Sequence, residues 1–286
     1  MKPAAFDYVR ADSVEHACRL LTEAGSEARL LAGGQSLIPM MNLRLARPSM
    51  LVDIGRLPLS GIEIGRGRVR IGALTRHRQV LDDAGLRAAA SIFAETYRYI
   101  AHPTIRNLGT AGGSVAHADP TAEIPTLLVL LDGEIEAASS RGQRAIAAGE
   151  FFKGAFTTAL EPDEIITALS FPIPAGAWGG CFLELAEREG DFALAAAGVT
   201  IEREGDRITN ARIVLSGADS APVRASDVEA SLRGQVMDED RAAAAGMAAA
   251  SNRQSYDDIR ASAEYRRSLL AELTSRALLT AYRRAG

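Results

Sequence analysis

Cysteine is nearly absent from this sequence. Of its 286 residues only Cys18 and Cys181 are cysteines, and they stand far apart in the chain. The chain therefore contains no C-x-x-C redox pair and no group of thiolates that could hold an iron–sulfur cluster. Any such cluster that works with this protein must belong to another polypeptide. Two unpaired cysteines also agree with a reducing compartment.

Histidine is scarce as well, with four in the whole chain. None of them shows the H-x-x-x-H or histidine–carboxylate spacing of a zinc or iron site, so we expect no metal centre in this chain. Ser36 and Ser114 stand beside glycines, but neither lies in a G-x-S-x-G nucleophile elbow. Hydrolase chemistry is therefore disfavoured, and no residue is assigned a catalytic role.

Long apolar runs and basic blocks are missing too. No uninterrupted apolar stretch approaches about 18 residues, and residues 1–7 lack the apolar core of a signal peptide. We therefore expect no transmembrane segment and a cytoplasmic protein. The formal net charge of −4 comes from intermixed acids and bases, with no basic block to follow a phosphate backbone. Nucleic acid is not an expected partner.

Two glycine-rich segments about 75 residues apart are the most informative feature that is present. They read AGGQS at residues 32–36 and GTAGGS at residues 109–114. Each adjoins an apolar run, so we expect tight turns at which backbone N–H groups approach a ligand. Two such turns suit the diphosphate of a dinucleotide. Neither is a G-x-G-x-x-G fingerprint or a phosphate loop with its lysine, so conventional Rossmann and Walker sites are excluded.

The first region, residues 1–57, predicts a small parallel sheet with helices. Asp12 and Glu15 form a capping-box-like start, a helix follows, and Gly25 ends it. The next expected elements are a strand at 29–32, a brief helix at 38–43 and a strand at 51–54. This order of elements favours parallel pairing.

The second region, residues 58–175, predicts an antiparallel sheet with helices. Apolar segments on both sides of Gly65 and Gly67 indicate a hairpin. Thr75 is expected to cap a long helical tract through Tyr99, which breaks near Asp83 and Gly85 and ends at Pro103 before the second glycine segment.

Asp119 and Pro120 predict the start of the next helix in this region, because aspartate caps helices and proline suits the first helical position. The helix is expected at 124–131. Strands are expected at 134–138, 144–147 and 165–171.

The third region, residues 176–286, follows the clearest break in composition, a stretch of prolines and glycines from Pro172 to Gly180. Three strands are expected at 181–185, 195–202 and 207–215. An alanine-rich, charged segment from Asp227 onward predicts helices. The residues that share the inner face of the last helix are Leu269, Leu270, Leu273, Ala277 and Ala281. The whole chain is thus predicted to be α+β.

Several motifs carry a family resemblance, in the same order and spacing over essentially the whole chain. Residues 30–39 read LLAGGQSLIP and residues 101–125 read AHPTIRNLGTAGGSVAHADPTAEIP. Further on, 190–193 read GDFA and 262–267 read SAEYRR. The sequence resembles the medium, FAD-binding subunit of the molybdenum hydroxylases, the group that includes aerobic carbon monoxide dehydrogenase, bacterial nicotine dehydrogenase and the flavin part of xanthine dehydrogenase.

The resemblance implies a two-part FAD-binding fold of the vanillyl-alcohol-oxidase or p-cresol-methylhydroxylase type, followed by a domain with a small antiparallel sheet and a helical bundle. It implies that FAD is bound non-covalently between the first two regions. On this resemblance, the predicted FAD contacts are Leu31, Ala32, Gly33, Gly34, Gln35, Ser36, Leu37, Thr75, Ala101, Ile105, Gly109, Thr110, Ala111, Gly112, Gly113, Ser114, His117, Asp119, Leu160, Ile165, Ile166 and Phe192.

The two glycine segments match the stretches that contact the pyrophosphate in the family, with the hydroxyls of Ser36 and Thr110 as further donors. Asp119 matches the acidic residue near the adenosine end, and its alternative is the helix cap. Phe192 matches an aromatic position at the isoalloxazine ring, and its alternative is an ordinary core phenylalanine.

Other predicted contacts have equally ordinary alternatives. Leu160, Ile165 and Ile166 wall the flavin or simply fill a buried strand. His117 stands where relatives often carry asparagine, and it contacts FAD or is a surface histidine.

The chain also departs from its relatives at a few positions. Ala111 stands where relatives usually carry isoleucine. Glu184 and Glu187 stand where some relatives carry basic residues, so the charge arrangement near the flavin cannot be copied from carbon monoxide dehydrogenase.

The function that the resemblance implies is electron transfer. A large molybdopterin-binding partner oxidises the substrate, a small partner relays electrons through 2Fe-2S clusters, and FAD in this chain passes them to NAD, a quinone or oxygen. The expected assembly is a dimer of heterotrimers. The alternatives are a self-sufficient, non-covalent FAD oxidase or reductase on the same fold and a scaffold that has lost flavin. Covalent flavin attachment is disfavoured because the first loop offers Gln35 in place of histidine or cysteine, and the intact glycine segments disfavour the scaffold.

Overall fold

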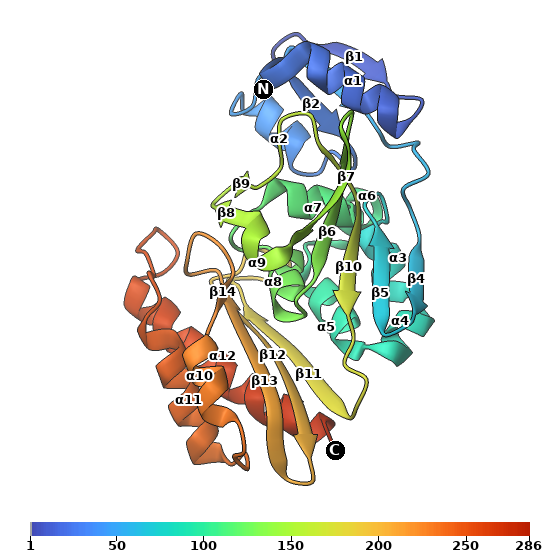
Figure 1. The fold of residues 1–286 in the computed structure, drawn as a ribbon. Coiled ribbons are helices and arrows are strands. Elements are labelled where there is room, and N and C mark those ends of the chain that lie inside the picture. Colours follow the sequence, from blue (N-terminus) through green and yellow to red (C-terminus); the bar gives the residue numbers. More distant parts are fainter. Residues whose placement is uncertain (1) are drawn as a thin grey trace.

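Three larger sheets follow one another along the chain, each with its own helices (Figure 1). The structure, a computed structural model, describes residues 2–286. In Figure 1 the N-terminal sheet lies at the top, the sheet that carries β5, β6 and β10 in the middle, and the sheet with β11 to β13 at the bottom. No helix in the described part of the chain is long and apolar enough to cross a membrane.

The first sheet has the order β1-β3-β2 with parallel pairing throughout, which confirms the predicted parallel unit. Its elements are β1 (Asp7–Arg10), α1 (Val14–Ala24), β2 (Ala28–Leu31), α2 (Leu37–Asn42) and β3 (Met50–Asp53). Strand β1 was not predicted, because its half-exposed residues show no apolar alternation. Gly25 ends α1 with φ +56° as expected.

The predicted cap of α1 is wrong by one residue. The Ser13 hydroxyl accepts the His16 N–H at 3.1 Å, and Asp12 lies outside the helix. Serine and aspartate are about equally good N-caps, so the sequence alone does not choose between neighbours of this kind.

The second sheet has the order β4-β5-β10-β6-β7, and every pairing in it is antiparallel. It confirms the predicted hairpin and the three predicted strands. The strands are β4 (Ile62–Gly65), β5 (Arg68–Gly72), β6 (Glu134–Ser139), β7 (Gly142–Ala147) and β10 (Ile165–Pro172). A two-stranded sheet of β8 (Phe152–Gly154) and β9 (Thr157–Thr158) follows the short helix α9 (Ala148–Phe151).

Five helices follow β5, and the last of them begins within the second glycine segment. They are α3 (His77–Asp82), α4 (Ala84–Ala89), α5 (Ser91–Tyr99), α6 (Pro103–Leu108) and α7 (Ala111–His117). The predicted break at Asp83 is confirmed, because its carboxylate caps α4 by accepting the Leu86 N–H at 2.7 Å. Phe93 of α5 packs edge-on against Phe171 of β10 at 5.0 Å, so these helices and the sheet share one core.

Three expectations in this stretch are wrong. Arg76, and not Thr75, is the N-cap of α3, while the Thr75 hydroxyl accepts the Gly61 N–H at 2.9 Å and ties the hairpin to the helices. Pro103 does not end a helix but begins α6, where its missing N–H costs nothing. The second glycine segment is not a turn, because its residues from Ala111 onward form the start of α7.

Asp119 is not the cap of the next helix. Helix α8 (Glu123–Leu130) has Ala122 at its N-cap position. The Asp119 carboxylate instead accepts the Thr121 N–H at 2.9 Å and the Thr121 hydroxyl at 2.7 Å. This local Asx-type turn competes with capping, as aspartate side chains often do.

The third sheet is antiparallel, with the order β11-β12-β13-β14. Its elements are β11 (Trp178–Leu185), β12 (Ala195–Glu204), β13 (Arg207–Ser216), β14 (Val223–Arg224), α10 (Ser226–Leu232), α11 (Glu239–Ser251) and α12 (Ala263–Arg284). Helix α12 packs on β11, β12 and α11, and Leu270, Ala277 and Ala281 are buried there as predicted. The predicted strands and helical tail are therefore confirmed, whereas the division at 57 and 175 stays a prediction.

Candidate functional site

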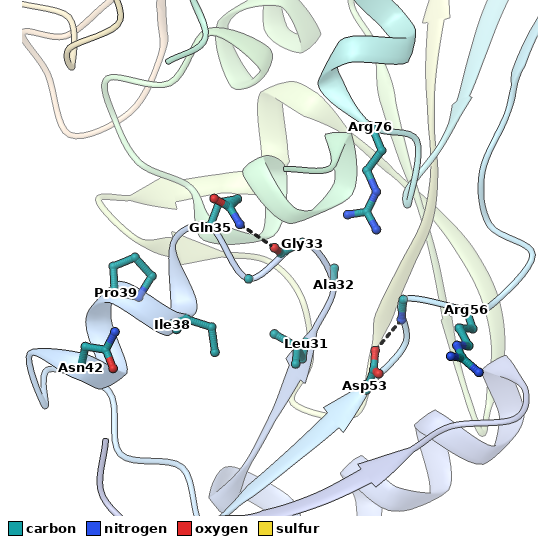
Figure 2. Close-up of a pocket in the computed structure, with 12 residues that line it drawn as sticks. Leu31, Ala32, Gly33, Gln35, Ile38, Pro39, Asn42, Asp53, Arg56 and Arg76 are labelled. Carbon is teal, nitrogen blue, oxygen red and sulfur yellow. Dashed lines mark hydrogen bonds between the residues drawn. The ribbon is translucent and has the colours of Figure 1, made fainter. Parts of the chain in front are cut away.

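A hollow of about 610 Å³ opens at the carboxyl ends of β2 and β3 (Figure 2). The loop after β2, the loop after β3 and one face of α2 line it, and Arg76 at the start of α3 closes it from the second region. The lining residues are Leu31, Ala32, Gly33, Gly34, Gln35, Ile38, Pro39, Asn42, Asp53, Gly55, Arg56 and Arg76. The hollow thus lies where the first two predicted regions meet.

The loop at residues 32–37 offers a row of unused backbone donors. None of its six N–H groups has a hydrogen-bond acceptor within residues 2–286. Its carbonyls, by contrast, are used: that of Gly34 accepts the Ile38 N–H at 3.1 Å, and that of Gly33 accepts the Gln35 side-chain amide at 3.0 Å. Backbone N–H groups need acceptors, and a concave row of them attracts anions. These donors fit a diphosphate.

Gly34 gives this loop its shape. Its φ is +73°, a conformation that residues with a Cβ rarely adopt. An added Cβ would lie 3.2 Å from Ile38 Cγ1 and 3.3 Å from Leu31 Cδ1. The glycine therefore serves the local backbone first, and the exposed N–H groups follow from that backbone.

The second glycine segment uses its donors differently. The N–H groups of Ala111 and Gly112 donate to the carbonyls of Thr75 at 3.0 Å and Ala73 at 2.8 Å. The Gly113 N–H donates to the Thr110 hydroxyl at 3.2 Å, which makes Thr110 the N-cap of α7. These donors are occupied by the protein itself. The glycines here serve close packing, since a Cβ on Gly112 would lie 2.6 Å from Ala73 Cβ.

The two glycine segments nevertheless touch. A Cβ on Gly33 would overlap the Leu108 carbonyl oxygen and would lie 3.0 Å from Gly109 Cα. The Arg76 guanidinium also donates to the Leu108 carbonyl, and the His77 N–H donates to that of Gly109 at 3.1 Å. The structure therefore holds the donor-rich loop directly against the segment that leads into α7.

Asp53 at the end of β3 anchors the floor of the hollow. One carboxylate oxygen accepts the Gly55 N–H at 2.8 Å, and the other accepts the Tyr8 hydroxyl and Arg10 Nε, the latter at 3.4 Å. Burial opposes ionisation of this carboxyl, but the hydrogen bonds from Tyr8, Gly55 and Arg10 outweigh it and lower its pKa. Asp53 is thus an anion with a structural role on both of its oxygens, and Figure 2 shows its bond to the backbone of Gly55.

Of the predicted contacts, the hollow brings together Leu31 and the four residues after it. Thr75, Ile165 and Ile166 are buried, with Ile165 in the core of the first sheet and Ile166 in the core of the second. Leu160 is half-buried against the second core. These three apolar side chains therefore pack against the protein's own cores, and their contact with the flavin stays a prediction.

Phe192 is not a core residue, which overturns that alternative for it. Its side chain is 65% exposed in the loop between β11 and β12. The same loop lies against residues 101 and 102, where FAD contact was predicted for Ala101. A Cβ added to Gly190 would lie only 2.7 Å from His102 Nδ1. Ala101 has φ +40°. Its carbonyl accepts a hydrogen bond from Arg106 Nη1 at 2.7 Å, and Arg106 directly follows Ile105, another predicted contact.

His117 is half-buried near the end of α7 and packs against Phe156 at a tilt of 48°, with ring centroids 5.1 Å apart. Burial lowers the pKa of His117, against the opposite effect of Asp119. Its imidazole is therefore held more strongly in the neutral form than a free surface histidine. Neither His117 nor Asp119 lines the hollow.

Sequence reasoning missed several residues of the hollow. Asp53, Arg56 and Arg76 bring its charges, and Ile38, Pro39 and Asn42 bring one face of α2. Asp53 could have been found, because side chains at the carboxyl ends of adjacent parallel strands meet at one edge. Arg76 could not, since its contact with the loop at 32–37 arises from a distant part of the chain.

A second group of titratable residues lies between α5, α8 and β11, with Tyr97 buried and Glu123 and Glu184 half-buried. Burial and the neighbouring Glu123 raise the pKa of Glu184 to about 10, and burial raises that of Glu123 to about 7. Glu184 Oε2 and the Tyr97 hydroxyl are buried with no hydrogen-bond partner within the described chain. Both carboxyls therefore favour their protonated forms, and neither lines the hollow.

Comparison with known protein families decides what this arrangement is. Residues 4–174 match the family described as the FAD-binding domain in molybdopterin dehydrogenase, and residues 181–281 match the carbon monoxide dehydrogenase flavoprotein C-terminal domain. The chain belongs to this family. It is an FAD-binding medium subunit of the molybdenum hydroxylase type, and as such a subunit of an oxidoreductase whose cofactor in this chain is FAD.

Individual relatives agree along the full length of the medium subunit. The 6-hydroxypseudooxynicotine dehydrogenase complex subunit alpha of Paenarthrobacter nicotinovorans is 40% identical over 100% of this chain and 97% of its own. The carbon monoxide dehydrogenase structure from Hydrogenophaga pseudoflava matches with a TM-score of 0.97 at 34% identity, over 100% of both chains. Quinoline 2-oxidoreductase from Pseudomonas putida 86 matches with a TM-score of 0.95 at 36% identity, over 100% and 99%. The predicted family and fold are confirmed.

Proposed function

We propose that this medium subunit is the flavin relay of a three-part dehydrogenase. A small partner with 2Fe-2S clusters delivers electrons that a large molybdopterin-binding partner takes from the substrate, and this chain passes them to NAD, a quinone or oxygen. The complex works in the cytoplasm as a dimer of heterotrimers. The six unused N–H groups at residues 32–37, in a hollow of about 610 Å³, are the observation that carries the proposal.

The FAD diphosphate binds to this row of donors, non-covalently and without a lysine or a metal. The Ser36 side chain is free for the same task, because it makes no capping bond to α2 and is exposed. The segment from Gly109 to Ser114 supports the cradle from behind, since all its N–H groups except that of Thr110 have acceptors within the protein. The proposal assigns Asp119 to the adenosine end and Phe192 to the isoalloxazine ring, and the resemblance of their motifs to the family supports this.

The hollow suits electron transfer better than acid–base catalysis. Its titratable side chains are Asp53, Arg56 and Arg76, and the Asp53 carboxylate is already occupied by Tyr8, Arg10 and Gly55. Bound flavin supplies the chemistry of the relay, because it accepts and gives electrons singly or in pairs. What the chain contributes is position, charge neutralisation and exclusion of water.

The names of the relatives support a partner-dependent role. They are called the medium subunit or medium chain of hydroxylases and dehydrogenases, or one lettered subunit of a dehydrogenase complex. A medium subunit of this type is expected to need partner chains for substrate oxidation. We further propose that the chain divides at residues 57 and 175 and that FAD binds between the first two parts.

The test compares the chain alone with the chain co-expressed with its genomic neighbours. We expect the isolated chain to bind FAD and to show no oxidation of candidate substrates such as N-heterocycles, aldehydes or carbon monoxide. With a cysteine-rich small partner and a large molybdopterin-type partner, substrate should reduce the flavin. Substrate oxidation by the isolated holoprotein would instead establish the self-sufficient oxidase, and failure of FAD to bind after reconstitution would sink both readings.

A further inference from the structure

Arg266 is the largest side chain that is completely buried in the described chain. It belongs to the first turns of α12, far from the hollow at 32–37 in sequence. A buried guanidinium is costly unless it is paired, and here Nη1 and Nη2 have partners whereas Nε has none within the described chain. Its partners therefore indicate what this charge is retained for.

Two of those partners are backbone carbonyls, one just before β12 and one just after β13. Arg266 Nη1 donates to the carbonyl of Leu194 at 2.9 Å and to that of Gly217 at 3.1 Å. Leu194 is the second residue after Phe192 and lies just before β12. The buried arginine thus holds the C-terminal side of the Phe192 segment.

The third partner is the Asp258 carboxylate, which lies 2.8 Å from Arg266 Nη2. Asp258 belongs to the loop at residues 252–262, between α11 and α12. Partial burial opposes its ionisation, but the N–H groups of Ala261 and Arg260, each at 2.9 Å, and the Arg266 guanidinium outweigh this and lower its pKa to about 2. The Arg266 guanidinium also lies over the Tyr256 ring, 4.6 Å from its centroid. The loop is therefore tied to Arg266 at two points.

Asp258 also forms an ion pair with a second arginine, Arg260. Arg260 Nε lies 3.6 Å from the same Asp258 oxygen, and Arg260 Nη1 donates to the carbonyl of Phe192 at 3.2 Å. The carbonyls on both sides of Ala193 are thus each bound by an arginine, and both arginines share Asp258.

Packing does not hold the Phe192 side chain, because it is 65% exposed. The β11–β12 ladder ends at the Leu185 and Ala195 pair, so it does not fix Phe192 either. The direction of the ring therefore depends on the backbone of residues 192–194, which the two arginines hold.

We propose that Arg260 is a positioning residue for Phe192, and that Asp258 and Arg266 hold Arg260 in place for that task. The loop at 252–262 is then a strap that orients the aromatic ring toward the flavin. This inference rests on the proposed contact between Phe192 and the isoalloxazine ring. The C-terminal region would then contribute to the flavin site by orienting the aromatic ring, a role that neither glycine segment has.

The experiment uses the assembled, FAD-loaded complex and measures the midpoint potential and the fluorescence of its flavin. Phe192→Ala should shift the potential and increase the fluorescence, because the ring no longer quenches the flavin. Arg260→Ala and Asp258→Asn should shift both readouts in the same direction, and Arg260→Ala should add nothing in the Phe192→Ala background. Arg276→Ala, which removes an exposed arginine paired with Glu272 on α12, is the matched control and should change neither readout.

The outcomes separate the inference from the function on which it rests. If Phe192→Ala changes the flavin while Arg260→Ala and Asp258→Asn leave it as in the Arg276→Ala control, the positioning role is refuted. If Phe192→Ala itself changes nothing, the contact between Phe192 and the flavin is refuted and the inference with it, while retained FAD leaves the relay intact. Because a buried Arg266 variant risks misfolding, the exposed Asp258 and half-buried Arg260 carry the test.

Discussion

Gly33 lies against the main chain of Leu108 so closely that any side chain at residue 33 would overlap the Leu108 carbonyl oxygen. This contact joins the loop after β2, in the first predicted region, to the end of α6, in the second. The same carbonyl accepts a hydrogen bond from Arg76, which closes the hollow. The glycine at this position is required by the protein's own packing before any ligand binds.

Gly33→Ala should therefore separate the two segments. Overpacking of this kind costs about 1–3 kcal/mol, and here the obstacle is rigid backbone. We expect a lower denaturation midpoint together with weaker FAD binding, since the loop that carries the donors must move. Thermal unfolding and flavin titration measure the two effects, and a variant unchanged in both would contradict the contact.

Gly34→Ala tests the donor row itself. Forcing a non-glycine residue into a φ of +73° costs about 1–2 kcal/mol, and the loop relaxes by turning its N–H groups away. We expect much lower FAD content in the purified protein. Gly205→Ala is the control, because Gly205 has φ +58° in the β12–β13 turn with nothing within 4 Å of an added Cβ. That variant should lose comparable stability and keep its FAD; equal FAD loss in both would show that strain alone is responsible.

Thr110→Ala removes the N-cap of α7. The hydroxyl accepts the Gly113 N–H, and losing such a cap typically costs about 1 kcal/mol. Thr110→Ser keeps the hydroxyl and should restore most of the stability. Chemical denaturation of both variants measures the difference, and equal stability of the alanine and serine variants would argue against the cap.

Glu184→Gln should change how stability depends on pH. An acid whose pKa is raised to about 10 in the folded state, against about 4.3 in the unfolded chain, binds its proton more tightly when folded. Wild-type stability should therefore fall as pH rises from about 5 to 9. The glutamine variant cannot ionise, so its stability should decline less over this range. Unfolding in denaturant at several pH values measures this, with the exposed Glu187→Gln as the control.

The two cysteines should be unreactive in the folded protein. Cys18 is 1% exposed and Cys181 is 2% exposed, and burial raises the pKa of both thiols, that of Cys181 to about 11. The thiolate is the reactive form, so both access and ionisation are suppressed. A chromogenic disulfide reagent should detect no thiol under native conditions and two in denaturant. Fast reaction of either thiol in the native state would contradict the packing around it.

Local patterns predicted the elements well and their ends less well. The hairpin around Gly65 and the strand at residues 165–171 follow from apolar alternation and turn residues, which depend on near neighbours. The caps of α1 and α8 were misplaced, because several residues near each end could serve as a cap. At α3 a tertiary contact decided the matter, because Thr75 holds Gly61 instead of capping the helix.

The site was predicted in part for the same reason. The loop at residues 32–36 is visible in the sequence because glycines and a short strand stand together. Arg76 and the strap at residues 252–262 are not, since each meets its target only after distant segments pack. Ile165 and Ile166 are buried, but no local pattern separates a core residue from a flavin wall, so their contact with FAD stays a prediction.

The sequence by itself determined the family of this protein and its kind of cofactor. Its motifs are short, their order is kept along the chain, and the scarcity of cysteine excludes a cluster of its own. Only the tertiary structure decided how the two glycine segments divide their work. The carbonyls of Thr75 and Ala73 accept the N–H groups of Ala111 and Gly112 in the second segment, while nothing in the described chain accepts those of the first. Hydrogen-bond acceptors brought from elsewhere in the fold make that difference, and no local pattern contains them.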